Sequence, residues 1–429
     1  MKKKYRIILY TSIFLLCVVA SIILVVKKSN SVYEEESKPK VVKHKSMLSM
    51  NLEQTAGSGD YKTVTQSSWP TEGYKFNAEL SKCENGSTLS WDDTKKAVIV
   101  SGNLSDKCYV YFDIYQPTLA EYIKSQYTGT QGENNIYYHD SDLANGAGDN
   151  SYRYAGANPN NFVCFGTIES PCPIDNLYRI IGVFGENYHG ANGKQLVKLI
   201  KYDYMTTDEL GTDGDYSQTY KEWGMDSTYK GTYGDGERIG VYYWNYKATG
   251  SATNTWSTSL LNKTNLNTNF INNIGTTWAN KIATVTWKVG GNTWANIGTK
   301  TSSVAYTNEI TNPVTTNTTD NATTYSAKIG LMYVSDYGFA ASPDAWTLTM
   351  SSYNNTTATN NNWMYMGLYE WTISRYADYS GNAFGVYYDG RVGNGGVNVD
   401  YGVRASFNLE SSVSYVSGSG SMSDPIVIN

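Results

Sequence analysis

Histidine, charge and familiar catalytic motifs are all scarce in this chain. Of its 429 residues, three are histidine and 17% are charged. The sequence contains no Gly-x-Ser-x-Gly nucleophile turn, His-Glu-x-x-His metal motif, phosphate-binding P-loop or dinucleotide fingerprint. His44, His139 and His189 are too scattered for most histidine-based schemes of catalysis. We therefore predict that the protein is not an enzyme and that it uses neither a cofactor nor a metal ion.

Beyond the N-terminal region, basic residues are outnumbered by acidic residues. Residues 1–48 carry ten lysines and arginines against three glutamates, a net charge of +7. The remaining 381 residues carry 24 basic against 36 acidic groups, a net charge of −12. An acidic body in which 14% of the chain is aromatic lacks the basic surface that nucleic acids require. We expect no nucleic-acid partner.

The N-terminal region has the features of a membrane anchor. Residues 7–26 contain no charge, and their number matches the roughly 20 residues that a helix needs to span a bilayer. Lys2, Lys3, Lys4 and Arg6 precede the run, and Lys27 and Lys28 follow it. Because the larger cluster of positive charges comes before the apolar run, we expect the N-terminus to lie inside the cell and the rest of the chain outside it. A cleaved signal peptide is the alternative, but its candidate cleavage site at residues 18–20 lies inside the apolar run. We predict an uncleaved single-pass anchor, residues 1–30, in the cell membrane.

Four of the five cysteines lie beyond this run. They are Cys83, Cys108, Cys164 and Cys172, and four cysteines allow three connectivities that sequence alone does not decide. We predict local pairs, Cys83 with Cys108 and Cys164 with Cys172, because each pair falls within one apparent module. Metal binding is the weaker alternative, since the chain has no Cys-x-x-Cys. Disulfides agree with an exported chain.

The remainder divides into a stalk, a small module and a large head. Residues 31–56 are mostly charged and polar without a sustained period, which predicts a stalk linker. Residues 57–115 contain three short strand patterns, at 87–91, 97–100 and 108–112, separated by turn residues. They predict a small, disulfide-linked, all-β module. We assign residues 116–429 to a single α+β head.

Several local patterns predict elements of the head. Thr118 and Glu121 form a capping-box pattern at a helix start. Residues 177–184 and 196–202 read as the strands of a hairpin, and residues 255–278 have helical spacing. Residues 351–362 are polar and of low complexity, which predicts a surface loop. The aspartates at 203, 208, 213 and 215 lack the spacing of an EF-hand and predict solvated loops rather than a calcium site.

The most unusual stretch is residues 376–402, which lie between two patterns of half-buried strands. Eighteen of its 27 residues are Tyr, Gly, Asp or Asn. Seven apolar residues are spaced through it as candidate buried anchors: Ala377, Ala383, Phe384, Val386, Val392, Val397 and Val399. Apolar anchors with permissive Tyr, Gly, Asn and Asp positions between them follow the logic of an antibody paratope. The alternative is a plain surface loop, since the whole chain is rich in Tyr and Gly.

Twelve polar or aromatic positions of this stretch are our candidate ligand-binding residues. They are Tyr376, Asp378, Tyr379, Asn382, Tyr387, Tyr388, Asp389, Arg391, Asn394, Asn398, Asp400 and Tyr401.

The two flanks carry a resemblance to a known fold. Glu370-Trp371-Thr372, followed some thirty residues later by Gly402-Val403-Arg404, resembles the closing strands of the C-type-lectin-like fold in its formylglycine-generating-enzyme branch. The resemblance covers roughly residues 130–429. The cysteines and metal ligands of the enzymes in that branch are missing, as is the calcium motif of the sugar-binding lectins. The resemblance therefore implies the fold, and it implies neither catalysis nor calcium-dependent sugar binding.

A narrower resemblance concerns residues 376–402 themselves. The segment resembles the variable region of the C-type-lectin-like proteins of diversity-generating retroelements, in which template adenines are mutagenised. Asn codons changed at adenine never yield Lys, Glu, Gln, Trp or Met, and residues 376–402 contain none of these five types. The whole chain also resembles a family of anchored surface proteins from gut Firmicutes.

Two hypotheses of function follow from these patterns. The first is a membrane-anchored, extracellular, adhesin-like protein that binds a surface protein or glycan through residues 376–402. The second is a structural or adhesive protein of the cell envelope with a fixed specificity and no diversified site.

Overall fold

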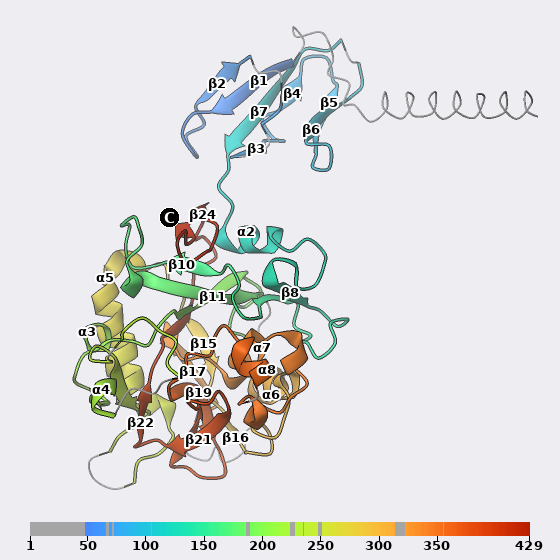
Figure 1. Ribbon diagram of the computed structural model, residues 1–429. Coiled ribbons are helices and arrows are strands. Elements are labelled where there is room, and N and C mark those ends of the chain that lie inside the picture. The colour runs from blue at the N-terminus through green and yellow to red at the C-terminus, as the bar shows by residue number, and fades with distance from the viewer. Residues whose placement is uncertain are drawn as a thin grey trace, which may run out of the picture. The chain divides into compact units, whose positions relative to one another are not determined.

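The computed structural model describes residues 48–429, except for residues 66–67, 71–72, 104, 186–188, 224–227, 235, 248–250, 314–321 and 355. The predicted anchor, residues 1–30, and the stalk up to residue 47 lie outside the described residues. Within the described part of the chain, no helix is both long and apolar enough to cross a bilayer. The protein is of mixed α+β class and mostly β-sheet, and its described residues divide into two compact units, one up to residue 116 and one over residues 117–429 (Figure 1).

The first unit is a small β module. Its main sheet has the order β2-β1-β7-β3, with β4 also paired to β7, and β5 and β6 form a separate hairpin. The strands are β1 (Leu48–Glu53), β2 (Tyr61–Val64), β3 (Tyr74–Phe76), β4 (Lys82–Cys83), β5 (Thr88–Asp92), β6 (Ala97–Ser101) and β7 (Cys108–Ile114). The three strands expected at 87–91, 97–100 and 108–112 are therefore confirmed as β5, β6 and β7.

The stalk prediction for residues 31–56 is wrong over β1. Met50 and Leu52 alternate with polar residues, and both pack with Val110 and Phe112 in the core of the module. β1 pairs in parallel with β7, a partner more than fifty residues away. A short, mostly polar stretch of sequence gives no sign of a pairing partner so far away in the chain, which is why the stalk prediction fails for β1.

Both disulfides are paired locally, as expected. Cys83 and Cys108 lie opposite each other on β4 and β7, and Cys164 is joined to Cys172 in the second unit. Disulfides persist in oxidising compartments, so this pairing is consistent with an extracellular or secreted protein.

Two seven-stranded sheets make up most of the second unit. One has the order β18-β23-β12-β11-β9-β8 with β10 on β11, and the other has the order β13-β14-β22-β19-β20-β21 with β16 on β19. Their strands are β8 (Ile136–His139), β9 (Ser151–Tyr154), β10 (Phe162–Cys164), β11 (Leu177–Phe184), β12 (Leu196–Lys201), β13 (Tyr216–Thr219), β14 (Gly240–Tyr243), β16 (Gly291–Asn292), β18 (Ile329–Gly330), β19 (Glu370–Tyr376), β20 (Asn382–Val386), β21 (Val392–Gly396), β22 (Asp400–Gly402) and β23 (Ser406–Asn408). Two small pairs are β15 (Val285–Lys288) with β17 (Thr324–Ala327), and β24 (Tyr415–Ser417) with β25 (Val427–Ile428).

Short helices surround these sheets, with α5 on one side in Figure 1 and α6, α7 and α8 on the other. The α-helices are α2 (Leu119–Ser125), α3 (Thr207–Leu210), α4 (Tyr220–Trp223), α5 (Ile271–Ala279), α6 (Ser302–Tyr306), α7 (Val334–Ala340) and α8 (Thr356–Asn360). The π-helices are η5 (Leu261–Phe270) and η6 (Thr307–Thr311). The short 3-10 helices are η1 (Glu133–Asn135), η2 (Ile174–Asn176), η4 (Trp256–Thr258), η7 (Pro343–Ala345) and η8 (Met350–Ser352).

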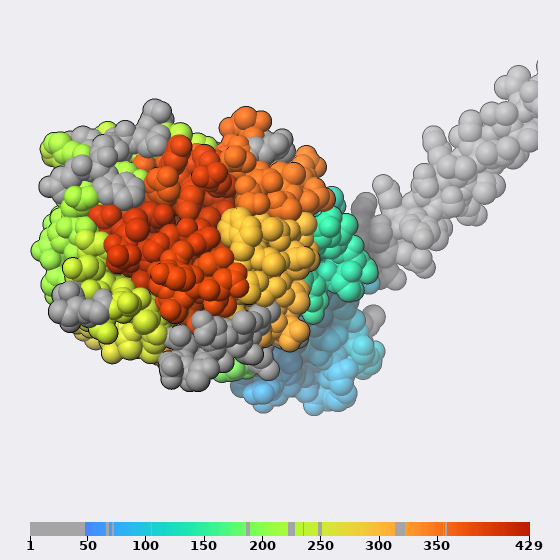
Figure 2. Space-filling view, turned by 90° about the horizontal axis from the view of Figure 1, so that it is seen from below, coloured from blue at the N-terminus to red at the C-terminus, as the bar shows by residue number. Residues whose placement is uncertain are grey.

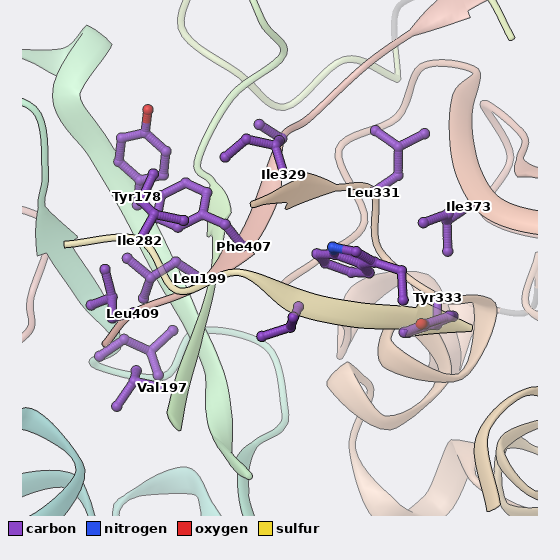
Figure 3. Packing of buried hydrophobic residues seen from close by; sticks show 14 of the residues in the cluster. Tyr178, Val197, Leu199, Ile282, Ile329, Leu331, Tyr333, Ile373, Phe407 and Leu409 are labelled. Carbon is purple, nitrogen blue, oxygen red and sulfur yellow. The ribbon is translucent and has the colours of Figure 1, made fainter. Parts of the chain in front are cut away.

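A shared apolar core joins the two sheets of the second unit. Figure 3 shows Tyr178 and Leu199 from the β11–β12 hairpin close to Phe407 of β23, with Ile329 next to Phe407 and Leu331 farther along, toward Ile373. The same cluster continues to Ile373 and Trp371 on β19. The core therefore connects the first sheet to the strand from which residues 376–402 depart.

The local predictions for the head have mixed outcomes. The capping box of Thr118 and Glu121 is confirmed, as are the β11–β12 hairpin and the helical character of residues 255–278. The predicted surface loop at 351–362 is wrong in part, because it contains α8 and buries Tyr353.

The expectation of solvated aspartates is wrong for two of the four. Asp203 and Asp215 are each 1% exposed. Asp203 accepts hydrogen bonds from Tyr229 and Thr232, and Asp215 accepts one from the backbone N–H of Leu261. Both carboxylates therefore fix loops of the head, because a buried carboxylate needs hydrogen-bond donors around it.

Candidate ligand-binding surface

Residues 376–402 form strands and tight turns at one end of the second unit. β19 leads into the segment, β20 and β21 form an antiparallel hairpin, and β22 returns to pair with β14 and the start of β19. Figure 2 shows this end of the unit face-on, with the segment as a broad red-orange surface. The sheet thus presents the segment as a continuous face rather than as a separate loop.

Most of the predicted anchors hold this face to the core. Ala377, Ala383, Phe384, Val386, Val392 and Val397 are all buried, the most exposed of them at 4%. Val399 is wrong as an anchor, because it is 38% exposed. It follows β21 in a turn where its backbone N–H donates to Gly396, and the turn directs it away from the core.

A buried ion pair closes the base of the segment. The Arg404 Nε donates to Glu370 Oε1 at 2.8 Å, and Nη2 donates to Oε2 at 2.9 Å. The side chains are 1% and 2% exposed, and Arg404 also donates to the Met364 carbonyl at 2.6 Å. Burial opposes the charge of Arg404, but the Glu370 carboxylate outweighs that effect and raises the pKa of the guanidinium. The Glu-Trp-Thr and Gly-Val-Arg motifs therefore meet in one buried ion pair, which we call the Glu370–Arg404 lock.

Above this lock, aromatic rings stack from the core to the surface. The Trp371 ring lies 4.2 Å from the Tyr401 ring, and Tyr401 lies 4.9 Å from Tyr369. Tyr369 in turn contacts Tyr387 and Tyr388 at centroid distances of 5.0 and 5.3 Å. Because rings in such contact restrict one another, the outer tyrosines rest on a rigid support.

The predicted site residues divide by exposure into three groups. Asp378, Tyr379, Tyr388, Arg391 and Asn398 are exposed, and Tyr376, Asn382, Tyr387, Asp389, Asn394 and Asp400 are half-buried. Tyr401 is only 5% exposed, so its assignment to the exposed binding surface is wrong. Burial raises the pKa of its hydroxyl and keeps the group neutral within the aromatic stack.

Three glycines of the segment make room for this arrangement. A Cβ at Gly393 would lie 2.4 Å from the Tyr387 ring, and a Cβ at Gly395 would lie 2.7 Å from the Tyr401 hydroxyl. At Gly385 the obstacle is backbone, since a Cβ would lie 2.8 Å from the Glu370 carbonyl oxygen. Gly385 is therefore fixed by the fold, whereas Gly393 depends on which side chain occupies position 387.

The tip of the β20–β21 hairpin is also preorganised. Tyr387 donates from its hydroxyl to the Asn394 carbonyl at 2.8 Å, which holds its ring over β21. The Arg391 guanidinium lies 5.0 Å from the centroid of that ring and 3.5 Å from Asp389. Aromatic side chains held in this way bind with little loss of conformational entropy.

One residue outside the segment clamps its first turn, and sequence analysis missed it. The fully buried Asn254 donates from Nδ2 to the carbonyls of Tyr376 at 2.6 Å and Asn382 at 2.7 Å, and more weakly to Tyr379 at 3.3 Å. Its backbone N–H donates to Ser380 at 2.7 Å. No periodic pattern marks an isolated asparagine as a clamp, because its partners lie more than 120 residues away.

We expect Asn254→Asp to loosen the turn at 376–382. The substitution keeps the shape of the side chain but faces carboxylate oxygens toward carbonyl oxygens, so that buried acceptors lose their donor. Such a loss costs about 1–3 kcal/mol. Hydrogen exchange of the Asn382 and Val397 amides, both bonded within this turn, should accelerate by one to two orders of magnitude.

Asn308→Asp is the matched control for this substitution. Asn308 donates to a single carbonyl, that of Asn296, in another part of the unit. It should leave exchange at Asn382 and Val397 unchanged. Equal protection in the Asn254 variant and the control would contradict the clamp.

The face presents exposed tyrosine, aspartate, arginine and asparagine side chains. Among the described residues, no group of three or more His, Cys, Asp or Glu side chains is placed to hold a metal ion. Buried ionisable pairs elsewhere, such as Lys198 with Asp336 and Arg153 with Asp149, are enclosed in the core. No family model, curated protein or solved structure matches the chain.

Proposed function

We propose that the protein binds a ligand outside the cell through the face formed by residues 376–402. The observation that carries this proposal is the combination of exposed polar and aromatic side chains with a rigid, buried base. Tyr379 is 65% exposed and Tyr388 is 37% exposed, whereas the apolar anchors of the segment other than Val399, and the Glu370–Arg404 pair at its base, are buried. Interfaces concentrate binding energy in aromatic anchors of this kind. The ligand would be a surface protein or glycan.

We also propose that the head is C-type-lectin-like and that the N-terminal residues 1–30 anchor it in the cell membrane. The two motifs that carry the resemblance meet at the base of the segment, where they would separate a constant frame from permissive positions. This division is what a diversified binding protein requires, since changes at exposed positions leave the buried support intact.

The second candidate function is an envelope protein of fixed specificity, favoured by the abundance of 38 Tyr and 39 Gly throughout the chain. Sequencing the locus across one population separates the two. Variation confined to the exposed and half-buried positions of 376–402, with Gly385 and Phe384 constant, supports the diversified surface. A uniform locus supports the alternative.

Binding itself is tested by applying the full chain to an array of purified glycans and proteins. We expect at least one array component to retain the protein, and Tyr379→Ala with Tyr388→Ala to reduce that binding at least tenfold. The reason is that each residue offers an exposed ring whose removal leaves the base intact. Alanine at hot spots typically costs about 2 kcal/mol or more.

The matched control is Tyr109→Ala with Tyr138→Ala, two partly exposed tyrosines far from the segment in the chain. It should bind as the unmodified protein does. Equal binding by both double variants would contradict the proposed surface.

A further inference from the structure

The face has a fixed aromatic neighbour at the edge where β22 meets β14. Tyr243 of β14 lies opposite Asp400 of β22 in the antiparallel register. Side chains of directly opposed residues project to the same side of a sheet, with their Cβ atoms about 5 Å apart. Both residues are half-buried. Asp400, inside the segment, is therefore a neighbour of an aromatic residue outside it.

Tyr243 is paired with a second, more exposed ring. The rings of Tyr243 and Tyr246 stack with centroids 4.7 Å apart and planes inclined by 25°, and Tyr246 is 46% exposed. Ser217 donates to the Tyr243 hydroxyl at 3.0 Å, and the Tyr246 backbone N–H donates to the buried Asp215 at 2.9 Å. The pair is thus positioned by residues that lie outside 376–402.

The charges of the segment leave one carboxylate beside this pair unneutralised. Asp389 pairs with Arg391, and Asp378 accepts a hydrogen bond from the Trp294 backbone N–H at 3.2 Å. The Asp400 carboxylate has no hydrogen-bond or ion-pair partner among the residues that the structure describes. A half-buried carboxylate next to an exposed aromatic face attracts a cation through both charge and the ring quadrupole.

We infer that Tyr243, Tyr246 and Asp400 form a subsite for a lysine or arginine side chain of a protein partner. The inference rests on the proposed function, and it favours a basic protein side chain over an uncharged sugar, because a cation adds charge attraction and a cation–π contact to the hydrogen bonds that sugar hydroxyls also donate to a carboxylate. Two of the three residues belong to the fixed frame. The ring pair of Tyr243 and Tyr246 therefore supplies a constant contact at the border of the face, while Asp400, inside 376–402, supplies the charge that selects a basic side chain.

Selection of random peptides on the immobilised full chain tests this subsite. A displayed library of twelve-residue peptides is enriched on the unmodified protein, and the affinities of selected peptides are measured by fluorescence polarisation. We expect enrichment of lysine and arginine over the input library. Asp400→Asn and Tyr246→Ala should each weaken the selected peptides about tenfold, as the loss of a cation–π or charge contact implies. Asp142→Asn, which removes an exposed charge elsewhere, should have no effect.

The possible outcomes distinguish a failure of the subsite from a failure of the proposed binding function on which it rests. Selected peptides that depend on Tyr379 and Tyr388 but show no basic enrichment and ignore Asp400→Asn would overturn the subsite and leave the binding face standing. Equal losses with Asp400→Asn and Asp142→Asn would also overturn it, because binding would then follow overall charge. Peptides unaffected by Tyr379→Ala with Tyr388→Ala would overturn the proposed face and the subsite together.

Discussion

Replacing Arg404 by methionine will lower the free energy of unfolding of the head by about 3–5 kcal/mol, because it leaves a buried carboxylate without its partner. Glu370 is 2% exposed and receives two donors from the Arg404 guanidinium. The same substitution removes the donor to the Met364 carbonyl. Urea denaturation of the full chain followed by tryptophan fluorescence measures the change, since nine of the eleven tryptophans lie in residues 117–429.

Two further variants show whether the charge or merely the volume of Arg404 matters. Arg391→Met removes an exposed arginine whose pair with Asp389 is solvated, and we expect a change below about 0.5 kcal/mol. Glu370→Leu combined with Arg404→Met should recover part of the lost stability, because an apolar pair leaves no unpaired charge. If Arg404→Met alone stays within 1 kcal/mol of the unmodified protein, the lock does not hold the base of the segment.

Trp371→Ala is expected to have an effect of similar size, a loss of about 3–5 kcal/mol, because truncating a buried tryptophan creates a large cavity. The Trp371 ring is fully buried, stacks on Tyr401, and donates from Nε1 to the Tyr242 carbonyl at 2.8 Å. Its loss would also remove the support beneath Tyr369. We therefore expect near-ultraviolet circular dichroism from the stacked rings to fall together with stability.

Trp371→Phe separates packing from hydrogen bonding at this position. Phenylalanine retains a ring against Tyr401 but leaves the Tyr242 carbonyl without the indole donor. An unsatisfied buried acceptor costs about 1–3 kcal/mol, so the phenylalanine variant should unfold between the unmodified protein and Trp371→Ala. A phenylalanine variant as unstable as the alanine variant would show that the ring against Tyr401 contributes little, and that the indole donor and the remaining indole volume account for the loss.

Features governed by near neighbours in the chain could be predicted from the sequence. The capping box needs only Thr118 and Glu121, and the β11–β12 hairpin only two apolar runs with a glycine-rich connection. The local disulfides join cysteines at separations of 25 and 8 residues. Most anchors of residues 376–402 were also predictable, because apolar side chains that stand among glycines and polar residues are stabilised by burial in the core.

Features governed by distant partners could not be predicted. Tyr401 reads as one more tyrosine of a permissive segment, yet Trp371 and Tyr369 enclose it. Asn254 is unremarkable until the carbonyls of Tyr376 and Asn382 lie around it. β1 resembles a polar linker until β7 is beside it. In each case the deciding contact crosses between strands or loops that the sequence does not place together.

The Glu370–Arg404 lock also bears on how the length of the segment can change. The lock joins residues 34 positions apart, so the ends of the segment are brought together by contacts that do not involve its exposed positions. For a loop whose ends are already closed, the entropy of closure rises only slowly with length, by about 0.6 kcal/mol for each doubling. Insertions at the turns around Ser380 and Asp389 would therefore lengthen the face at a modest entropic cost. A segment whose ends are held by this ion pair should therefore accept changes in the length of its turns as well as changes of residue type at its exposed positions.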